Sequence, residues 1–302
     1  MQKLRYHLMF CVLFSILLIT CGEALAAEAE KYRVEMYTVG EATVWAIADS
    51  TGDRERTVFP SADPGVLDEY MPSGGSPSAI MAFLVKTENE TLLVDTGFGA
   101  LSGSNASQLM GGLAQVGVTP EGITLVLLTH MHTDHVGGLI WDSKKAFPAA
   151  RVLSSRTERD FWLDEKLLDR FPDRRVNLEM VRNTFSMYGD AMQVFEYGDA
   201  VAPGITALDS HGHTPGHTSF LLESKGERML FWGDLIHAAA LQFPNPDINA
   251  VYDMNPEDAA AARANFMEKA AVEKFLIAGA HLPFPGVGTV EKADRGYVYR
   301  SR

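Results

Sequence analysis

Residues 129–138 read T-H-M-H-T-D-H-V-G-G, and both the histidines and the aspartate of this segment are groups that bind metal ions. The residues before it, 123–128, form a short apolar run rich in leucine and β-branched residues, which predicts a buried strand. Because ligands in α/β proteins gather at the carboxyl ends of strands, we expect a binding loop here. Four donors so closely spaced cannot all bind one tetrahedral ion, which indicates two adjacent ions; the donors are His130, His132, Asp134 and His135.

Further donors occur downstream, as a site for two ions requires. His213 lies in S-H-G-H-T-P-G-H-T, Asp234 in F-W-G-D-L and His281 in I-A-G-A-H-L-P-F. Each of them follows an apolar segment or lies in a glycine-rich turn, and five of the nine histidines of the chain belong to the combined set. The order of the donors along the chain is therefore H-x-H-x-D-H, followed by H, D and H.

This order resembles the metal-binding pattern of the metallo-β-lactamase superfamily, and the resemblance runs from about Tyr32 to the C-terminus. It implies an α/β fold, a four-layered αββα sandwich. It implies two divalent metal ions, with Zn²⁺ as the first choice and Mn²⁺ or Fe²⁺ as alternatives. It also implies individual roles: His130, His132 and His213 hold the first ion, Asp134, His135 and His281 hold the second, and Asp234 bridges both.

Other residues near these motifs have different expected roles. Asp95 matches a carboxylate that orients the ligand loop in this family, with an ordinary turn residue as the alternative. The resemblance aligns His213, and not His211, with the ligand, and it makes His217 a supporting residue. His237 follows the bridging aspartate by three residues, where lactonases of the family often have a substrate-contacting tyrosine. A histidine there could donate to a developing oxyanion or leaving group, with plain packing as the alternative.

The N-terminus has the composition of a secretory signal peptide. Basic residues Lys3 and Arg5 precede an apolar stretch, 8–19, and then the sequence A-L-A-A at 24–27. This stretch is too short for a stable membrane span. We expect cleavage after Ala26 or Ala27, a secreted or periplasmic protein, and one domain covering residues 27–302. A retained N-terminal anchor, or lipidation at Cys21, remains open.

Charge and cysteine content restrict the function further. The formal net charge is −13, and no run of lysine or arginine could neutralise a phosphate backbone, which excludes nucleic acid as a partner. We therefore expect a small, neutral or apolar substrate. Both cysteines lie inside the leader, so the expected mature chain has no thiol and no disulfide. The oligomeric state stays open, a homodimer being one alternative.

The first elements of the domain are expected to form an antiparallel sheet edge. Residues 32–37 and 42–47 have the pattern of strands, and 49–53 has the composition of a turn. Residues 53–77 are rich in Pro, Gly, Ser and charge, with one short helix near 66–70. Long loops in small domains are often lids, so 53–77 is predicted to be a loop or lid.

Four later segments have clear signals. We expect helices over 105–116 and 157–168, and a hairpin of strands 220–224 and 229–232 that delivers Asp234 at its end. Asn255 and Pro256 have the residue types of an N-cap and a first helical position, which predicts a helix running toward residue 274.

The expected chemistry is hydrolysis. A hydroxide that bridges two cations is a strong nucleophile near neutral pH, and it could attack a lactone, an ester or a phosphotriester. Asp134, bound to one ion only, could steer the attacking oxygen or accept its proton, so Asp134 and His237 are the candidate catalytic residues. The chain contains no G-x-S-x-G motif, and this mechanism needs no side-chain nucleophile.

Two stretches narrow the resemblance. A-H-L-P-F-P-G-V-G at 280–288 and W-G-D-L-I-H-A-A-A-L-Q-F at 232–243, together with the leader, look like the methyl parathion hydrolase and N-acyl homoserine lactonase branch. That branch binds its substrates with apolar side chains, for which the candidates here, if they are not simply core residues, are Trp141, Trp162, Phe243 and Phe284.

Three alternatives remain open from sequence. A glyoxalase II-like thioesterase shares every ligand. A mononuclear iron dioxygenase keeps the same H-x-H-x-D-H string. The donors could also only store metal or stiffen the fold, although seven mixed donors leave coordination positions open to water.

Overall fold

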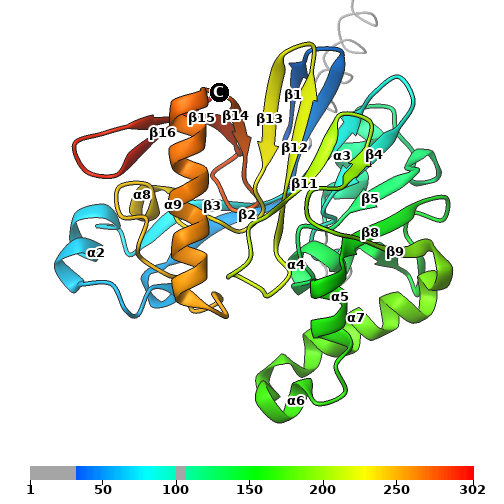
Figure 1. The fold of residues 1–302 in the computed structure, drawn as a ribbon, viewed down its shortest axis with the longest axis horizontal. Helices are drawn as coiled ribbons and strands as arrows, with labels where there is room; N and C mark the ends of the chain where they lie inside the picture. Colours follow the sequence, from blue (N-terminus) through cyan, green and yellow to red (C-terminus); the bar gives the residue numbers. More distant parts are fainter. Residues whose placement is uncertain (1–31, 100–106) are drawn as a thin grey trace, which may run out of the picture.

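The protein is a sandwich of two sheets with helices on the outer faces (Figure 1). The computed structural model describes residues 32–99 and 107–302, so the expected signal peptide at 1–26 lies outside the described residues. Within these ranges, each of the two main sheets has seven strands. The predicted αββα architecture is confirmed. No helix in the described residues is both long enough and apolar enough to cross a membrane.

The first sheet contains the N-terminal strands. Its spatial order is β1 (Val34–Val39), β2 (Ala42–Glu55), β3 (Gly75–Lys86), β4 (Thr91–Val94), β5 (Leu125–Leu127), β8 (Arg151–Ser155) and β9 (Met192–Phe195). The strands from β1 to β4 pair antiparallel, whereas β4, β5, β8 and β9 pair parallel. Because β4 and β5 run in the same direction, the residues that follow them, Asp95 and the loop after Leu127, meet at one edge of the sheet.

The second sheet contains the C-terminal strands. Its order is β10 (Ala200–Ala202), β11 (Ile205–Asp209), β12 (Thr218–Ser224), β13 (Glu227–Phe231), β14 (Leu276–Ala278), β15 (Val287–Lys292) and β16 (Tyr297–Ser301). β13 and β14 pair parallel, and β12 is antiparallel to β13. The start of β12 therefore lies beside the ends of β13 and β14, which places His213, Asp234 and His281 at the same edge.

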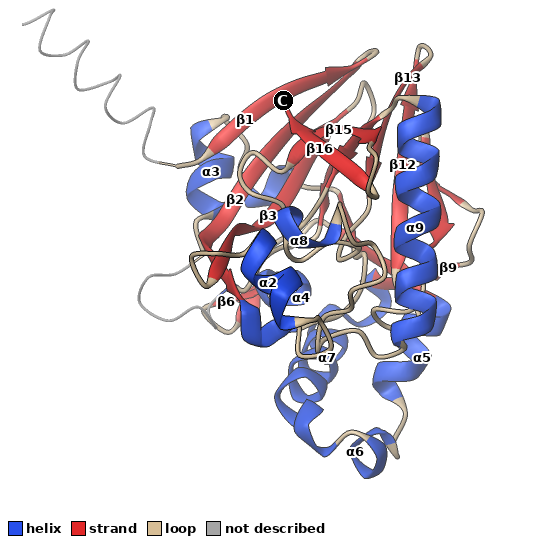
Figure 2. Cartoon of the chain, turned by 90° about the vertical axis from the view of Figure 1, so that its left-hand side faces the viewer, coloured by secondary structure: helices blue, strands red, loops and turns tan. Residues whose placement is uncertain are grey.

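Three apolar layers hold the sandwich together. Between the sheets, Phe83 of β3 meets Phe231 of β13 with ring centroids 5.4 Å apart. Helices α3 (Leu109–Gln115), α5 (Arg156–Leu163) and α7 (Arg175–Tyr188) cover the first sheet, and α9 (Pro256–Glu273) covers the second (Figure 2). The remaining short elements are α2 (Pro64–Tyr70), α4 (Thr133–Val136), α6 (Leu167–Arg170), α8 (Ala239–Gln242), the strand pair β6 (Ile140–Trp141) and β7 (Lys144–Lys145), and the 3-10 turns η1 (Arg56–Val58), η3 (Pro120–Gly122), η4 (Gly137–Leu139), η5 (Pro172–Arg174) and η6 (Gly189–Ala191).

Helix α9 and the second-sheet hairpin follow the sequence closely. The Asn255 side chain accepts a hydrogen bond from the backbone N–H of Asp258, with Pro256 at the first helical position. The helix ends at Glu273, and Lys274 takes a left-handed conformation with φ 57°. The hairpin of β12 and β13 pairs Ser224 with Glu227, as predicted. Strong local caps and turns therefore fixed these two elements.

The predicted boundaries of segment 53–77 are wrong. Strand β2 continues to Glu55, so the predicted turn at 49–53 is strand, and Asp53 pairs with Pro77 across β2 and β3. A bulge removes Asp49 from the ladder, and its carboxylate accepts hydrogen bonds from the N–H groups of Phe98 and Leu109. The true connection is 56–74. It contains the expected short helix, α2, and the role of this segment as a lid stays a prediction.

The helices after β8 also differ from expectation. The predicted helix 157–168 ends at Leu163, and α6 begins only at Leu167. Helix α7 was missed, although Leu178, Val181 and Tyr188 are spaced for one helical face and are buried on the first sheet. The predicted helix 105–116 is α3, and residues 105 and 106 lie outside the described ranges.

Candidate metal centre

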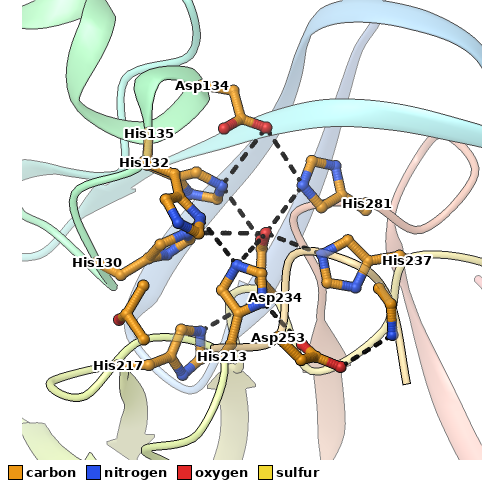
Figure 3. Close-up of polar contacts among 12 residues, drawn as sticks. His130, His132, Asp134, His135, His213, His217, Asp234, His237, Asp253 and His281 are labelled. Atoms are coloured by element: carbon orange, nitrogen blue, oxygen red, sulfur yellow. Dashed lines mark hydrogen bonds and ion pairs between the residues drawn. The ribbon is translucent and has the colours of Figure 1, made fainter. Parts of the chain in front are cut away.

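All seven predicted metal ligands meet at one edge of the sandwich. The loop after β5 supplies His130 and His132, and helix α4, which follows it, supplies Asp134 and His135. The loops before β12, after β13 and after β14 supply one ligand each. Figure 3 shows these side chains pointing toward Asp234 at the centre. Asp134 is the most exposed of the seven, with 18% of its side-chain surface accessible. The structure therefore brings together every residue that the sequence singled out as a ligand.

The first group consists of three histidines whose ring nitrogens converge. Nε2 of His130 lies 3.0 Å from Nδ1 of His132, which lies 3.0 Å from Nε2 of His213. In a tetrahedral zinc site with Zn–N bonds of about 2.0–2.1 Å, ligand atoms lie about 3.3 Å apart. The three nitrogens are thus spaced for one ion, and they can be grouped with Asp234.

The second group of ligand atoms lies on the other side of Asp234. Oδ2 of Asp134 is 3.3 Å from Nε2 of His281 and 3.8 Å from Nε2 of His135. Oδ1 of Asp234 is 3.1 Å from Nε2 of His135, whereas its Oδ2 is 3.2 Å from Nε2 of His213. One carboxylate therefore faces both groups, which is the position that a bridging ligand requires.

Two buried atoms at the centre lack hydrogen-bond partners. Among the described residues, neither Nε2 of His135 nor Oδ1 of Asp234 has one. Unsatisfied buried polar atoms are rare because each costs about 1–3 kcal/mol. A cation between the two groups would satisfy both atoms, so this donor set fits two divalent ions.

Buried carboxylates orient two of the histidines from behind. Oδ2 of Asp95 lies 2.8 Å from Nδ1 of His135, and its Oδ1 accepts from the N–H of Thr129. Asp95 holds a left-handed conformation, φ 59°, which is uncommon outside glycine and frequent at functional sites. Oδ1 of Asp253 lies 2.9 Å from Nδ1 of His213. Each carboxylate accepts a hydrogen bond from the Nδ1–H group, which leaves Nε2 free to bind metal. Sequence reasoning identified Asp95 and missed Asp253, which no local motif marks.

A third buried carboxylate, Glu158 of α5, joins two ligand loops. It accepts hydrogen bonds from the N–H of Met131 at 2.8 Å and from Nε1 of Trp162 at 2.7 Å. It also accepts from Oγ1 of Thr214 at 2.7 Å and from the N–H of Gly216 at 3.0 Å. Burial raises the pKa of Glu158. The sequence did not mark this residue, because three of its four partners lie in loops remote from it along the chain.

The supporting role predicted for His217 agrees with its contacts. Its Nε2 accepts from the N–H of Asp234 at 3.0 Å, while Nδ1 lies 3.0 Å from the Ser210 carbonyl oxygen. Burial lowers the pKa of His217 to about 3, so the ring is neutral. A Cβ atom at Gly233 would approach Nε2 of His217 to 2.5 Å, so this turn requires glycine. His211 is exposed and contacts Asp209, away from the centre.

His237 lies beside the ligand cluster. Its ring stacks on His281 with centroids 5.1 Å apart, and its Nε2 is 3.2 Å from Oδ2 of Asp234. The two atoms are not aligned for a hydrogen bond, and neither ring nitrogen has a partner among the described residues. Burial lowers the pKa of His237 to about 4. The ring is therefore neutral at pH 7 and retains one N–H that can donate.

A pocket of about 210 Å³ opens over the centre. Besides five of the ligands, its wall contains two aromatic residues and three donors of hydrogen bonds: Phe98, Tyr252, Arg54, Arg174 and Asn177. The predicted pocket aromatics do not line it. Trp162 and Phe243 are buried in the helix layers, and Trp141 and Phe284 pack against apolar cores. The expected apolar wall is therefore wrong for these four residues, because packing between sheets and helices takes up their rings.

Comparison with known proteins agrees with this geometry. The family model described as the metallo-beta-lactamase superfamily matches residues 75–295. The chain belongs to the metallo-β-lactamase superfamily. Among solved structures, the chain resembles hydrolase AbOPH of the beta lactamase superfamily, with 30% identity, a TM-score of 0.83, and coverage of 89% of this chain and 97% of that one. It shares its fold with AidC, a dizinc quorum-quenching lactonase, at 24% identity and a TM-score of 0.81, over 90% of this chain and 98% of that one.

A curated relative in this superfamily is the N-acyl homoserine lactonase of Bacillus cereus. The two chains are 25% identical over 171 residues, a match that covers 48% of this chain and 59% of the relative. The chain thus spans little more than half the length of the curated relatives that it first matches. The superfamily resemblance that the sequence motifs indicated is confirmed.

Proposed function

We propose that this superfamily member is a dinuclear metal-dependent hydrolase that opens lactones or cleaves esters or phosphotriesters. The observation that carries the proposal is the position of Asp234, whose carboxylate contacts His213 of the first group of ligands and His135 and His281 of the second. Two bound divalent ions, with zinc as the first choice, would polarise the substrate oxygen and lower the pKa of a water molecule. The similarity to hydrolase AbOPH and to N-acyl homoserine lactonases supports this class of reaction.

Asp134 is proposed to handle the proton of the attacking water. Its contacts with His135 and His281 are both made by Oδ2. Oδ1 is then available to accept a proton at the mouth of the pocket, which the partial exposure of this side chain allows. In D134N this acceptor is lost, so we expect kcat to fall by at least about 100-fold, the lower range for removal of a general base.

His237 is proposed to donate a hydrogen bond to the developing oxyanion or the leaving group. Its neutral ring has an N–H without a partner in the described part of the chain, which supports this role. The variant H237F keeps an aromatic ring of similar size and removes the donor. A drop in kcat with unchanged metal content supports the role, whereas unchanged kcat assigns His237 to packing.

The deciding experiment couples metal stoichiometry to a substrate screen. The zinc-loaded protein is expected to hold two equivalents of metal and to hydrolyse at least one of a lactone, an aryl ester and a phosphotriester. Turnover of a thioester alone would favour the glyoxalase II-like alternative. A coloured, iron-loaded protein that consumes oxygen would favour the mononuclear dioxygenase. Absence of turnover across the panel would refute the proposal.

We further propose that residues 1–26 direct export, so that the mature protein is secreted or periplasmic. The support is the order of basic residues, apolar stretch and small residues at the N-terminus. N-terminal sequencing of the exported protein is expected to start at Ala27 or Glu28. Recovery of the intact N-terminus at a membrane would indicate an anchor instead.

A further inference from the structure

We propose that the pocket selects a small substrate that carries a carboxylate, held by Arg54 and Arg174 beside the metal centre. This inference rests on the proposed hydrolase function and names its substrate class. It replaces the sequence-based expectation of a neutral or apolar substrate, because that expectation used the net charge of the whole chain.

The two arginines flank the centre. Nη2 of Arg54, on β2, lies 3.1 Å from Nδ1 of His281, and Nη1 of Arg174, at the end of η5, lies 3.4 Å from Nε2 of His132. His132 and His281 lie on either side of Asp234 (Figure 3). Both guanidinium groups line the same pocket of about 210 Å³, so a bound substrate has a cation on each side.

Neither histidine can accept a hydrogen bond from its arginine in a metal-loaded site. Nε2 of His281 faces Asp134 and Asp234, and its Nδ1 lies 2.9 Å from the carbonyl oxygen of Ala79. Nδ1 therefore carries the ring proton and donates it to that carbonyl. The contact of Arg54 with Nδ1 joins two donors, which leaves this guanidinium without an acceptor there.

The same reasoning applies to Arg174. Nδ1 of His132 points toward His130 and His213, so Nε2 carries the ring proton once Nδ1 binds metal. The N–H groups of Arg174 that face this nitrogen then lack an acceptor. Both arginines keep donors directed at the pocket after the ions are bound.

In the described part of the chain, Arg54 has no acidic partner and Arg174 has a single, exposed one. Among the described residues Arg54 has no ion pair, and its buried Nε has no hydrogen-bond partner. The nearest acid to Arg174 is the exposed Asp173, at 3.8 Å. The carboxylates in the pocket wall, Asp134 and Asp234, are assigned to metal.

Packing holds Arg54 in place. Its guanidinium carbon lies 5.8 Å from the ring centroid of Tyr252, within cation–π range, and its backbone pairs with Ser76. A fixed guanidinium with free N–H groups binds a carboxylate through charge-assisted and often paired hydrogen bonds. The pocket is smaller than the roughly 300–1,000 Å³ of typical ligand sites. Its volume therefore favours a short ester or lactone with its carboxylate a few bonds from the scissile carbonyl.

The test compares two esters that differ in one terminal group. The para-nitrophenyl monoester of glutaric acid carries a carboxylate, and para-nitrophenyl pentanoate has a methyl group in its place. We expect the zinc-loaded protein to hydrolyse the anionic ester with a kcat/KM at least about tenfold higher, because a hydrogen bond to a charged group contributes that much or more. Equal values, or a preference for the neutral ester, would overturn the inference.

Variants identify the residues responsible. R54Q and R174Q are each expected to lower kcat/KM for the anionic ester by about 10- to 100-fold more than kcat/KM for the neutral ester. R175Q is the matched control, because Arg175 is exposed and paired with Glu179. Equal losses for both esters would assign these arginines to structure, which overturns the inference, and melting temperatures check that each variant folds.

A binding measurement separates this inference from the proposed function. Calorimetry with glutarate, the product of the anionic ester, is expected to show at least about tenfold weaker binding to R54Q and R174Q than to the zinc-loaded wild type. If no ester, lactone or phosphotriester is hydrolysed, the proposed hydrolase function fails, and this binding result still decides the anion site. If esters are hydrolysed but glutarate binds all variants equally, only the carboxylate inference fails.

Discussion

The two halves of the sandwich build the metal centre in different ways. The N-terminal half supplies its four donors from one short motif, His130 to His135, which covers the end of the loop after β5 and most of helix α4. The C-terminal half supplies three donors, His213, Asp234 and His281, from three loops that meet only because β12, β13 and β14 are paired. The first group therefore depends mainly on local chain geometry, and the second depends on the whole sheet.

The buried carboxylates that support the ligand histidines also differ between the two halves. In the N-terminal half, Asp95 supports His135 and is itself held by the N–H of Thr129. In the C-terminal half, Asp253 supports His213 and forms an ion pair with Arg263, both side chains being at most 1% exposed. Loss of Asp253 should thus disturb the fold as well as the site, whereas loss of Asp95 should disturb mainly the site.

The largest effect is expected at Asp234, because its carboxylate contacts ligands from both halves. In D234N the bridging charge is lost, so metal content should fall from two equivalents to one or fewer. Activity should fall by more than the roughly 100-fold that loss of a supporting residue costs. Metal analysis and kinetics check this, with D160N as the control because Asp160 is exposed. Retention of two ions in D234N would show that the two groups of ligands bind metal without the bridge that Asp234 provides.

D95N and D253N compare the two supports directly. Each should weaken metal binding at its own histidine by about 10- to 100-fold, measured by competition with a chelator. D253N should also lower the free energy of unfolding by about 3 kcal/mol, near the lower limit for a broken buried ion pair. The lower limit applies because Arg263 keeps its hydrogen bond to the Leu235 carbonyl. Equal stabilities of the two variants in denaturant titrations would contradict the difference between the halves.

Glu158 connects the loops of the two halves, so its loss tests whether they are coupled. In E158Q at least one N–H or O–H donor of Met131, Thr214 or Gly216 loses its acceptor. We expect a loss of about 1–3 kcal/mol in the free energy of unfolding, the range for one unsatisfied buried donor. E165Q, at an exposed site, should change neither stability nor metal affinity. Chemical denaturation with and without zinc measures both, and parallel behaviour of the two variants would refute the coupling.

The smallest change, counted for a single pH unit, is expected at the first group of ligands. Burial alone would lower the pKa of His213, but the carboxylates of Asp234 and Asp253 outweigh it and raise the pKa to about 9 in the metal-free protein. Below that pH a proton must leave before metal binds, so the apparent affinity should rise with pH by up to about tenfold per unit and level off near pH 9. In D253N the plateau should begin at lower pH. A pH-independent affinity below 9, in titrations that also record proton release, would contradict this.

The overall charge of the chain and the local charge of the pocket lead to different predictions for the substrate. The net charge of −13 indicated a neutral or apolar substrate, whereas the pocket wall contains Arg54 and Arg174. Charge counted over a sequence describes the whole surface and long-range association. The charge that a substrate meets depends on the few side chains within reach of the pocket.

The sequence by itself determined the set of candidate ligands, the superfamily and the main elements. The signals were local patterns: histidine spacing, apolar strands ending in polar loops, and the Asn-Pro helix start. Each of them predicts a structure independently of distant residues. Local patterns did not predict the continuation of β2 through 49–55, because pairing with β3 decides it. They also did not predict helix α7, because packing on the first sheet decides it.

Only the tertiary structure decided which residues support the ligands and line the pocket. Asp253 reaches His213, Glu158 reaches Thr214, and Arg54 reaches His281 across 227 positions of sequence. No periodicity or spacing encodes such pairs, since they arise when sheet pairing brings strand ends to one edge. The sequence thus specified the atoms that can bind metal, and the packing of the two sheets specified how those atoms are held and which charge the substrate meets.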